Sequence, residues 1–244
     1  DALPISLTVI RDAEAAVQKK DPSFSIQKLD YDDAATYKML GQGETEGVFQ
    51  LESSGMKQVL VGLQPQNLED VIALISLYRP GPMDSIPTYL RNRHEPDKIS
   101  YKTPQLAHIL DVTNGCIVYQ EQVMQIFREL AGFSFGQADN VRRAMSKKKH
   151  AVMEAEREHF VHGCTEPGHE CPGCVANGIS EEVANEIYDE MSSFASYAFN
   201  KSHAACYAYV AFQTAYLKCH YPSEFMAALL TSVLDNTDKV IEYS

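Results

Sequence analysis

The stretch SHAACYAYVAFQTAYLKCH, which runs from Ser202 to His220, decides the fold class. It is largely apolar, contains no proline or glycine, and is typical of one long helix. Asn200 or Ser202 can cap its first turn, because both side chains can accept a hydrogen bond from an orphan backbone N–H group. The sequence therefore predicts a chain organised around helices.

The rest of the chain also favours helices, separated by clear breaks. Helices are predicted over 7–20, 32–40, 53–63, 68–77, a segment that ends near 130, 137–159 (as one helix or two), 180–194 and 222–234. The turn Tyr78-Arg79-Pro80-Gly81-Pro82 is predicted to be rigid, since two prolines around a glycine cannot continue a helix. Residues 91–104 and 162–178 are predicted loops. Strand signals are few, so the predicted fold class is mainly α.

Composition limits the class of protein. The chain has 244 residues, 45% of them hydrophobic and 22% charged, which is close to a soluble globular average and allows one large or two small domains. No run of 18 apolar residues is present, so we expect no membrane span. We find no secretory signal, which makes the cytoplasm the expected compartment. A formal net charge of -12 argues against nucleic-acid binding by the whole surface, but not against a local basic patch.

The most basic stretch of this acidic chain is RRAMSKKKH, residues 142–150, in which five of nine residues are Lys or Arg. On a helix, Asp139 and Arg143 lie four residues apart, as do Arg143 and Lys147. Like charges at this spacing repel by about 0.2–0.5 kcal/mol, which a nearby polyanion would reverse. Arg binds phosphate through a planar fork and Lys as a flexible point charge. The alternative is a solvated helix C-terminus, where cations interact favourably with the dipole.

A second anion site is predicted at the start of the 202–220 helix. The first N–H groups of a helix lack partners within it and attract anions. Lys201 and His203 lie beside these groups in the sequence. Arg79, in the rigid turn, is a weaker candidate. Two elements that favour phosphate within one chain strengthen the prediction of a phosphate site.

The segment HGCTEPGHECPGCVANG holds a cluster of potential metal ligands. The candidates are Cys164, His169, Cys171 and Cys174, with His159 and His162 as competing nitrogen ligands. Three thiolates and one imidazole suit a tetrahedral, structural Zn²⁺ site. We therefore predict a zinc-binding insertion over 162–178, in which the metal stabilises a loop too polar to fold by burial. The alternative is a redox pair or free thiols.

Six segments occur in an order that resembles a known family. They are GVFQLESSGM, LYRPGP, YQEQVM, GQADNVRRAMSKKK, FNKSHAACYAYVAFQTAYLKCHYPSEFMAALL and DNTDKV. Together they resemble the α subunit of bacterial DNA polymerase III (DnaE type), a C-family DNA polymerase, from about Leu7 to about Val240. The resemblance implies a helical fingers domain over 13–244, which contains the Cys/His-rich inserted loop. Residues 1–12 would be the edge of the palm.

The resemblance also implies what the charged residues bind. The fingers of such a DNA-directed DNA polymerase close over the incoming deoxynucleoside triphosphate (dNTP) and the template, so dNTP and primer-template DNA are the expected partners. The residues expected to line this cleft are Arg79, Arg142, Arg143, Lys147, Lys148, Lys149, Asn200, Lys201, Ser202 and His203. The sliding clamp and other replisome subunits are expected partners of the full-length protein. Catalysis of phosphoryl transfer is mostly positioning and neutralisation of charge, with metal ions bridging phosphate oxygens.

The sequence departs from the family where catalysis would reside. In relatives the palm aspartates lie upstream, and the last belongs to an Asp-Phe-Leu-Gly-Leu motif where this chain has Asp1-Ala-Leu-Pro-Ile-Ser. We therefore predict no catalytic residue here and place the Mg²⁺ of the full-length polymerase outside this chain. The insertion at 162–178 replaces a shorter linker. The expected fragment binds its substrates but does not polymerise.

Two other classes of protein stay open on the residues alone. One is a zinc-stabilised helical protein-interaction module, whose basic helix docks an acidic protein and whose binding depends on metal. The other is a structural helical domain with solvated charges. The polymerase hypothesis requires the cations of two helices to converge on one cavity. Arg142 and Lys201 on opposite faces, with no shared cavity, would contradict it.

Overall fold

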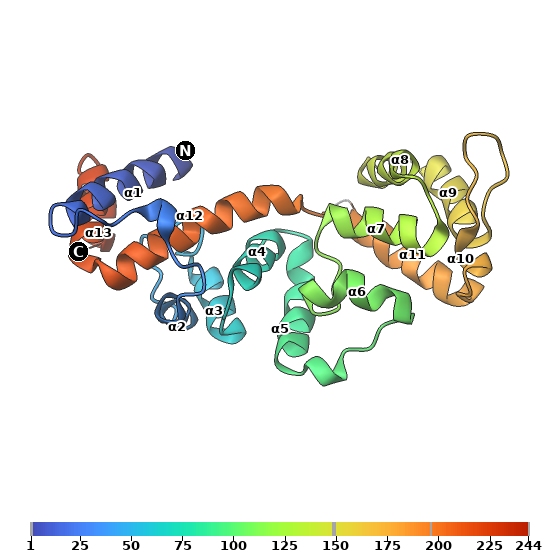
Figure 1. Cartoon of the computed structure of the whole chain (residues 1–244), viewed down its shortest axis with the longest axis horizontal. Coiled ribbons are helices and arrows are strands. Elements are labelled where there is room, and N and C mark those ends of the chain that lie inside the picture. Colours follow the sequence, from blue (N-terminus) through green and yellow to red (C-terminus); the bar gives the residue numbers. More distant parts are fainter. Residues whose placement is uncertain (1, 148–149, 196, 244) are drawn as a thin grey trace. The chain divides into compact units, whose positions relative to one another are not determined.

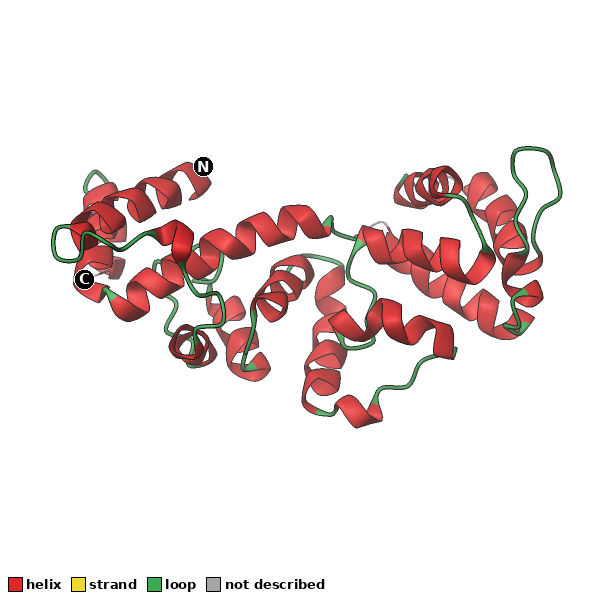
Figure 2. Ribbon diagram, viewed as in Figure 1, coloured by secondary structure: helices red, strands yellow, loops and turns green. Residues whose placement is uncertain are grey.

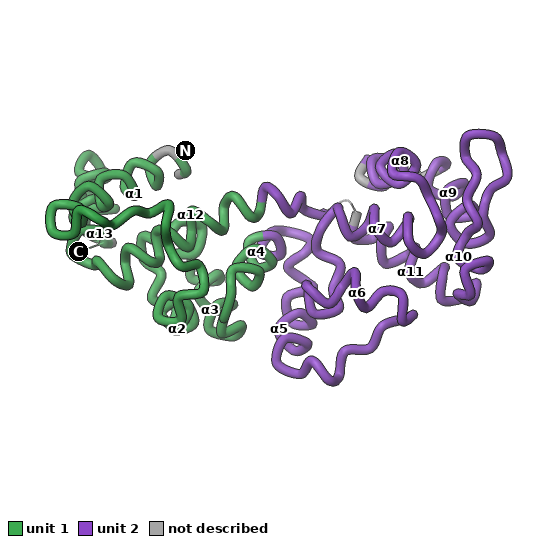
Figure 3. Tube along the Cα trace, in the orientation of Figure 1, with its two compact units in different colours: residues 1–75, 204–244 green, residues 76–203 purple. Residues whose placement is uncertain are grey.

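The computed structural model describes residues 2–147, 150–195 and 197–243 (Figure 1). Figure 2 shows helices joined by loops across these ranges. The β-type pairings within them are two isolated bridges, Tyr119 with Phe199 and Cys164 with Cys171. The prediction of a mainly α chain is confirmed. The chain forms two compact units, unit 1 from residues 1–75 and 204–244 and unit 2 from residues 76–203 (Figure 3).

Unit 1 gathers both ends of the chain. Its helices are α1 (Ala2–Gln18), α2 (Ala34–Gly41), α3 (Ser54–Leu63), α4 (Leu68–Leu77), α12 (Lys201–His220), α13 (Pro222–Ser232) and α14 (Thr237–Tyr243), with a 3-10 turn at Ile26–Lys28; α4 ends and α12 begins within unit 2. Ala13 of α1, Leu217 of α12 and Phe225 of α13 are fully buried in one cluster. Burial of a large apolar side chain stabilises a fold by about 1.5–3 kcal/mol, so these contacts fix α1 and α13 on α12.

Unit 2 is built around aromatic packing. Its helices are α5 (Ile86–His94), α6 (Ala107–Leu110), α7 (Gln120–Ala131), α8 (Phe135–Ser146), α9 (His150–His162), α10 (Gly173–Ala176) and α11 (Glu181–Ala195), with 3-10 turns at Pro82–Ser85, Pro96–Lys98, Pro104–Leu106 and Asp111–Thr113. Phe127 of α7, Phe160 of α9 and Tyr188 of α11 are fully buried. Their ring centroids lie 5.1 Å (Phe127–Phe160) and 5.7 Å (Phe160–Tyr188) apart. This packing makes α7, α9 and α11 a rigid support.

Polar side chains set several helix ends. Asp33 Oδ2 accepts a hydrogen bond from Thr36 N at 2.8 Å and caps α2. Ser53 Oγ accepts from Met56 N at 3.3 Å and caps α3. Each such cap satisfies one backbone N–H group that has no partner inside the helix.

Some boundaries differ from the predictions. The loop predicted over 91–104 is wrong at its start, because α5 continues to His94. Helices α5, α6, α10 and α14 are not predicted, α10 lies inside the loop predicted over 162–178, and α1 begins at Ala2 rather than Leu7. These segments lack a clear apolar period, on which the sequence predictions depend. The domain boundary predicted after residue 12 falls inside the continuous helix α1, and the palm edge stays a prediction. Across the described residues, no helix is both long and apolar enough to cross a membrane.

Candidate functional site

A short backbone pairing brings the start of α7 next to the start of α12. Gln120 N donates to Phe199 O at 2.9 Å, and Phe199 N donates to Val118 O at 3.3 Å. Tyr119 and Phe199 thereby form a parallel bridge. The buried apolar face of α7 anchors this helix in the core of unit 2. The segment YQEQVM, to which the sequence alone assigns no chemistry, is therefore a fixed support beside the predicted phosphate-binding residues.

Arg142 of α8 is held by two groups of the chain. Its Nε and Nη2 atoms donate to Asp139 Oδ1 at 3.0 and 2.7 Å. Its Nη1 atom donates to Gln120 Oε1 at 3.1 Å, and Gln120 Nε2 donates to Ala198 O at 3.0 Å. Only 17% of the Arg142 side chain is exposed. A single amide thus links the guanidinium of α8 to the segment that leads into α12.

Asp139 also binds the next arginine. Arg143 Nη2 lies 2.7 Å from Asp139 Oδ2, at the helical spacing noted in the sequence, and the Arg143 side chain is 64% exposed. The hydrogen bond from Arg142, together with the charge of both arginines, holds the pKa of Asp139 below its ordinary value. Two guanidinium groups share one carboxylate, so this part of α8 keeps a net positive charge. Lys147 follows at the end of α8 and is exposed, whereas Lys148 and Lys149 lie outside the described residues.

The start of α12 is capped from both sides. His203 N donates to Asn200 Oδ1 at 2.9 Å, so Asn200 rather than Ser202 is the capping residue. Asn200 Nδ2 donates to Glu121 Oε1 at 2.9 Å. Lys201 N donates to both carboxylate oxygens of Glu121, at 3.2 and 3.1 Å. The anion site predicted at this helix end therefore binds the carboxylate of Glu121. No pattern in the sequence indicates this contact.

The side chains after Asn200 lie close to aromatic rings. Lys201 Nζ lies 5.3 Å from the centroid of the buried Tyr119 ring, within range of a cation–π contact. The His203 ring lies 5.4 Å from that of Phe199. Ser202 and His203 are exposed. The side chains of Ser202 and His203 are therefore accessible to a ligand.

Arg79 has a different environment from the other predicted phosphate-binding residues. Its Nη2 atom donates to Tyr197 O at 2.9 Å, its Nε atom donates to Ser76 O at 3.2 Å, and its guanidinium carbon lies 4.0 Å from the centroid of the Phe199 ring. Burial lowers the pKa of Arg79. Gly81 has a φ of 103°, and a Cβ atom there would lie 2.4 Å from the Tyr197 ring. The rigid turn thus packs Arg79 against the segment that precedes α12.

One cavity of about 510 Å³ in unit 2 takes in parts of both predicted anion-binding elements. Its lining residues are Gln120, Glu121, Met124, Gln125, Arg128, Glu129, Phe135, Asp139, Arg142 and Asn200. Arg142 of α8 and Asn200 at the start of α12 therefore line one cavity, but Lys201, which the prediction paired with Arg142, does not line it. The predicted residues that do not line it are Arg79, Arg143, Lys147, Lys201, Ser202 and His203.

The charge of this cavity is nearly balanced. Two guanidinium groups, of Arg128 and Arg142, lie among three carboxylates, of Glu121, Glu129 and Asp139. Within the described part of the chain, no three Cys, His, Asp or Glu side chains are grouped so that they could hold a metal ion. Asp139 binds two arginines, and Glu121 binds the start of α12.

The Cys/His-rich loop closes on itself through its backbone. Cys164 and Cys171 exchange two N–H···O hydrogen bonds of 2.9 Å, and the Cys171 thiol donates to His159 O at 3.6 Å. Cys174 is fully buried, which raises the pKa of its thiol to about 12. His169 is exposed. The four predicted ligands are not assembled as a metal site in this arrangement, so zinc stays a prediction from the sequence.

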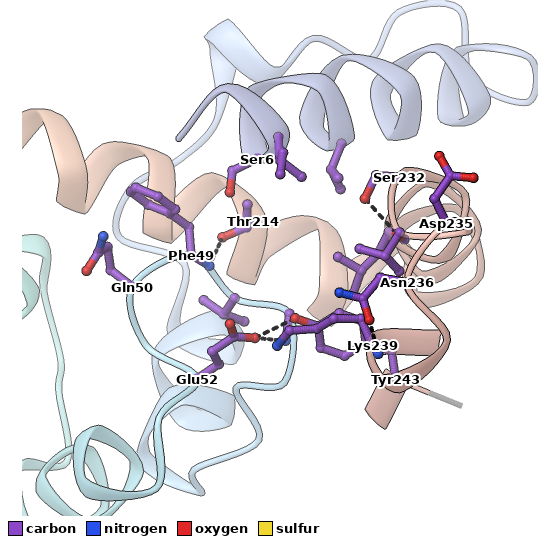
Figure 4. A pocket seen from close by; sticks show the side chains of 16 residues that line it. Ser6, Phe49, Gln50, Glu52, Thr214, Ser232, Asp235, Asn236, Lys239 and Tyr243 are labelled. Atoms are coloured by element: carbon purple, nitrogen blue, oxygen red, sulfur yellow. Dashed lines mark hydrogen bonds between the residues drawn. The ribbon is translucent and has the colours of Figure 1, made fainter. Parts of the chain in front are cut away.

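A separate cavity of about 360 Å³ lies in unit 1 (Figure 4). It takes in parts of two further segments of the resemblance, GVFQLESSGM and DNTDKV. Glu52 Oε2 accepts hydrogen bonds from Gly47 N at 3.2 Å and from Tyr243 Oη at 2.8 Å. Phe49 N donates to Thr214 Oγ1 at 3.1 Å. These contacts join the loop before α3 to α12 and α14, so they organise unit 1.

Comparisons with known proteins fit this arrangement. A family model described as the bacterial DNA polymerase III alpha subunit finger domain matches residues 6–168. The DNA polymerase III subunit alpha of Thermus aquaticus is 48% identical over 244 residues, which covers 98% of this chain and 19% of that protein. The protein of the same name from Bacillus subtilis is 44% identical over 239 residues, which covers 98% of this chain and 20% of that protein. The chain spans about one fifth of the length of these curated relatives.

Proposed function

The chain belongs to the family of bacterial DNA polymerase III alpha subunits, and we propose that it binds the triphosphate of the incoming nucleotide and primer-template DNA for template-directed nucleotidyl transfer. Within that family it is a helical fingers domain. The polymerase activity belongs to the full-length protein. That the chain alone does not polymerise stays a prediction.

The observation that carries the proposal is the convergence of Arg142 and Asn200 on one cavity. Arg142 is already held in a fixed orientation, so little side-chain entropy is lost when a phosphate binds it. A charged hydrogen bond from a guanidinium to a phosphate is about twice as strong as a neutral one. Arg143 binds the same carboxylate as Arg142, so the charge around Asp139 is net positive, although the charge of the cavity lining as a whole is nearly balanced. Within the cavity, the guanidinium of Arg142 is the group that we assign to a phosphate.

The remaining cations extend the proposal beyond the cavity. We assign to the phosphates of the nucleotide or DNA the residues Arg79, Arg143, Lys147, Lys148, Lys149, Lys201, Ser202 and His203. Mg²⁺ in the full-length polymerase would neutralise phosphate charge when bound, and we place it outside this chain. The sliding clamp and other replisome subunits would bind the full-length protein, in the cytoplasm.

The test uses primer extension by the full-length subunit. Arg142→Ala should raise the KM for dNTP or lower kcat, with about a tenfold loss in kcat/KM, because a charged phosphate contact is lost. Arg11→Ala is the matched control, since Arg11 is 71% exposed and pairs with its neighbour Asp12. Equal kinetics of Arg142→Ala and the wild type would remove this cavity from the proposal. The alternative, a zinc-stabilised interaction module, predicts that equality together with metal-dependent partner binding.

A further inference from the structure

The carboxylate of Glu121 lies between the N-termini of two helices. Glu121 belongs to the first turn of α7, and its oxygens accept hydrogen bonds from Lys201 N and Asn200 Nδ2 at the start of α12. Each helix N-terminus carries a partial positive charge of about half an elementary unit. The backbone pairing of Tyr119 with Phe199 brings these two positive ends together. An anion between the two helix N-termini offsets the repulsion between their partial positive charges. The carboxylate of Glu121 is this anion.

Gln120 makes a second connection that only a side-chain amide can make. Its Oε1 atom accepts from Arg142 Nη1, and its Nε2 atom donates to Ala198 O. A carboxylate at this position would repel the carbonyl oxygen of Ala198. A hydrocarbon side chain would bind neither partner. Gln120 therefore fixes the distance between α8 and the segment that leads into α12.

We propose that Gln120 and Glu121 are positioning residues for phosphate binding, which hold Arg142 and the Asn200–Lys201 turn in one arrangement without contacting the phosphate. This inference rests on the proposed function. Asn200 supports it, because its Oδ1 atom caps His203 N while its Nδ2 atom binds Glu121, so both ends of its amide are fixed.

A competing role for Glu121 has the opposite consequence. As a carboxylate at a predicted anion site, it would repel a phosphate and occupy the donors that the phosphate needs. Removal of a competitor lowers the KM for dNTP. Removal of a positioning residue raises it, because Arg142 and Asn200 then have to be ordered when the nucleotide binds. The sign of the change in KM separates the two roles.

The experiment measures steady-state primer extension by the full-length subunit with three variants. Glu121→Ala removes both carboxylate contacts and should lower kcat/KM for dNTP about tenfold, equivalent to about 1.4 kcal/mol. Glu121→Gln keeps one acceptor for Asn200 Nδ2 and should lose about threefold, a partial rescue. Gln120→Met keeps the length of the side chain and should also lose about threefold. Glu182→Ala is the control, since Glu182 has the same place in the first turn of α11 but does not line the cavity.

A double-mutant cycle distinguishes positioning from a general loss of stability. If Gln120 acts through Arg142, the effect of Gln120→Met on KM should shrink in an Arg142→Ala background. An effect of Gln120→Met that is fully retained in that background would overturn its role. Thermal unfolding of each variant shows whether it folds. If Glu121→Ala does not fold, Glu121→Gln still tests the role of the carboxylate.

The outcomes separate this inference from the proposed function. A higher KM for the Glu121 variants supports positioning. A lower KM, or an unchanged KM while Arg142→Ala raises it, overturns positioning and leaves the proposed function intact. If Arg142→Ala is also unchanged, the proposed function fails and the inference fails with it.

Discussion

Arg142 Nη1 donates a hydrogen bond to Gln120 Oε1 at 3.1 Å, and this contact joins α8 to the start of α7. Through the other end of the same amide, Gln120 also binds Ala198 O. The basic end of α8, the start of α7 and the approach to α12 thus share one side chain. Arg142, the first residue of the basic stretch, is therefore held by contacts within the fold.

Asp139 controls how much of this charge reaches a ligand. Asp139→Asn should release charge from Arg142 and Arg143, and so steepen the salt dependence of primer-template binding by about one unit in a plot of log K against log salt. At the same time kcat should fall, because Arg142 is held less firmly. Binding titrations over a series of salt concentrations measure the slope. Asp189→Asn, which releases Arg157 elsewhere in unit 2, should leave the slope unchanged. Equal slopes for Asp139→Asn and the wild type would contradict the prediction.

Gly81 is predicted to tolerate no side chain. Its φ is 103°, and the Tyr197 ring lies 2.4 Å from the place that a Cβ atom would take, so Gly81→Ala should be destabilising by about 2 kcal/mol or more. Gly136 in α8 has nothing within 4 Å of the same position, so Gly136→Ala should be neutral or stabilising by about 0.5 kcal/mol. Chemical denaturation of both variants provides the comparison. Similar losses of stability for the two would contradict this account of the turn.

The stability of unit 1 should depend on pH through Glu46. Hydrogen bonds from Lys57 and Lys218 lower the pKa of Glu46 from its ordinary 4.5 to about 2. A carboxylate whose pKa is lower in the folded state stabilises the fold above the unfolded pKa, and this contribution is lost as pH falls toward 2. Glu46→Gln should therefore lower Tm at pH 7, by an amount that shrinks below pH 4.5. Glu44→Gln, at an exposed position nearby, is the control. A Tm difference that stays constant down to pH 2.5 would count against the ion pairs.

Zinc in the 162–178 loop can be tested by metal analysis. The spacing of the cysteines predicts one zinc per chain in a chelator-free preparation, lost in Cys171→Ser. Cys206→Ser is the control, because Cys206 is exposed on α12, outside the loop. Substoichiometric zinc in the wild type would refute the prediction. The loop would then be held by the backbone pairing of Cys164 with Cys171 and by burial of Cys174.

Local signals account for the parts of the fold and site that the sequence predicts well. The helix over 68–77 follows from residues next to each other in the chain, and the caps at Asp33 and Ser53 bind backbone N–H groups three residues further on. Asn200 as a cap and the pairing of Asp139 with Arg143 have the same origin.

Long-range contacts account for what the sequence does not predict. Glu121 binds Asn200 and Lys201 only because folding brings the start of α7 to the start of α12. The spacing of apolar residues, from which helices and strands are predicted, carries no information about that contact. Arg79 illustrates the same limit, since its partners Tyr197 and Phe199 lie far along the chain. Charge and spacing identify the residues that can bind phosphate. The tertiary fold decides which of them share a cavity.

We propose that Arg142 and Asn200 form one binding site for the phosphates of the incoming nucleotide. The most direct test is the equilibrium Kd of dNTP for the full-length subunit bound to a primer-template whose primer ends in a dideoxynucleotide. Arg142→Ala and Asn200→Ala should each weaken dNTP binding about tenfold, whereas Arg11→Ala should match the wild type. An unchanged Kd for both cavity variants, with the primer-template still bound, would contradict the claim.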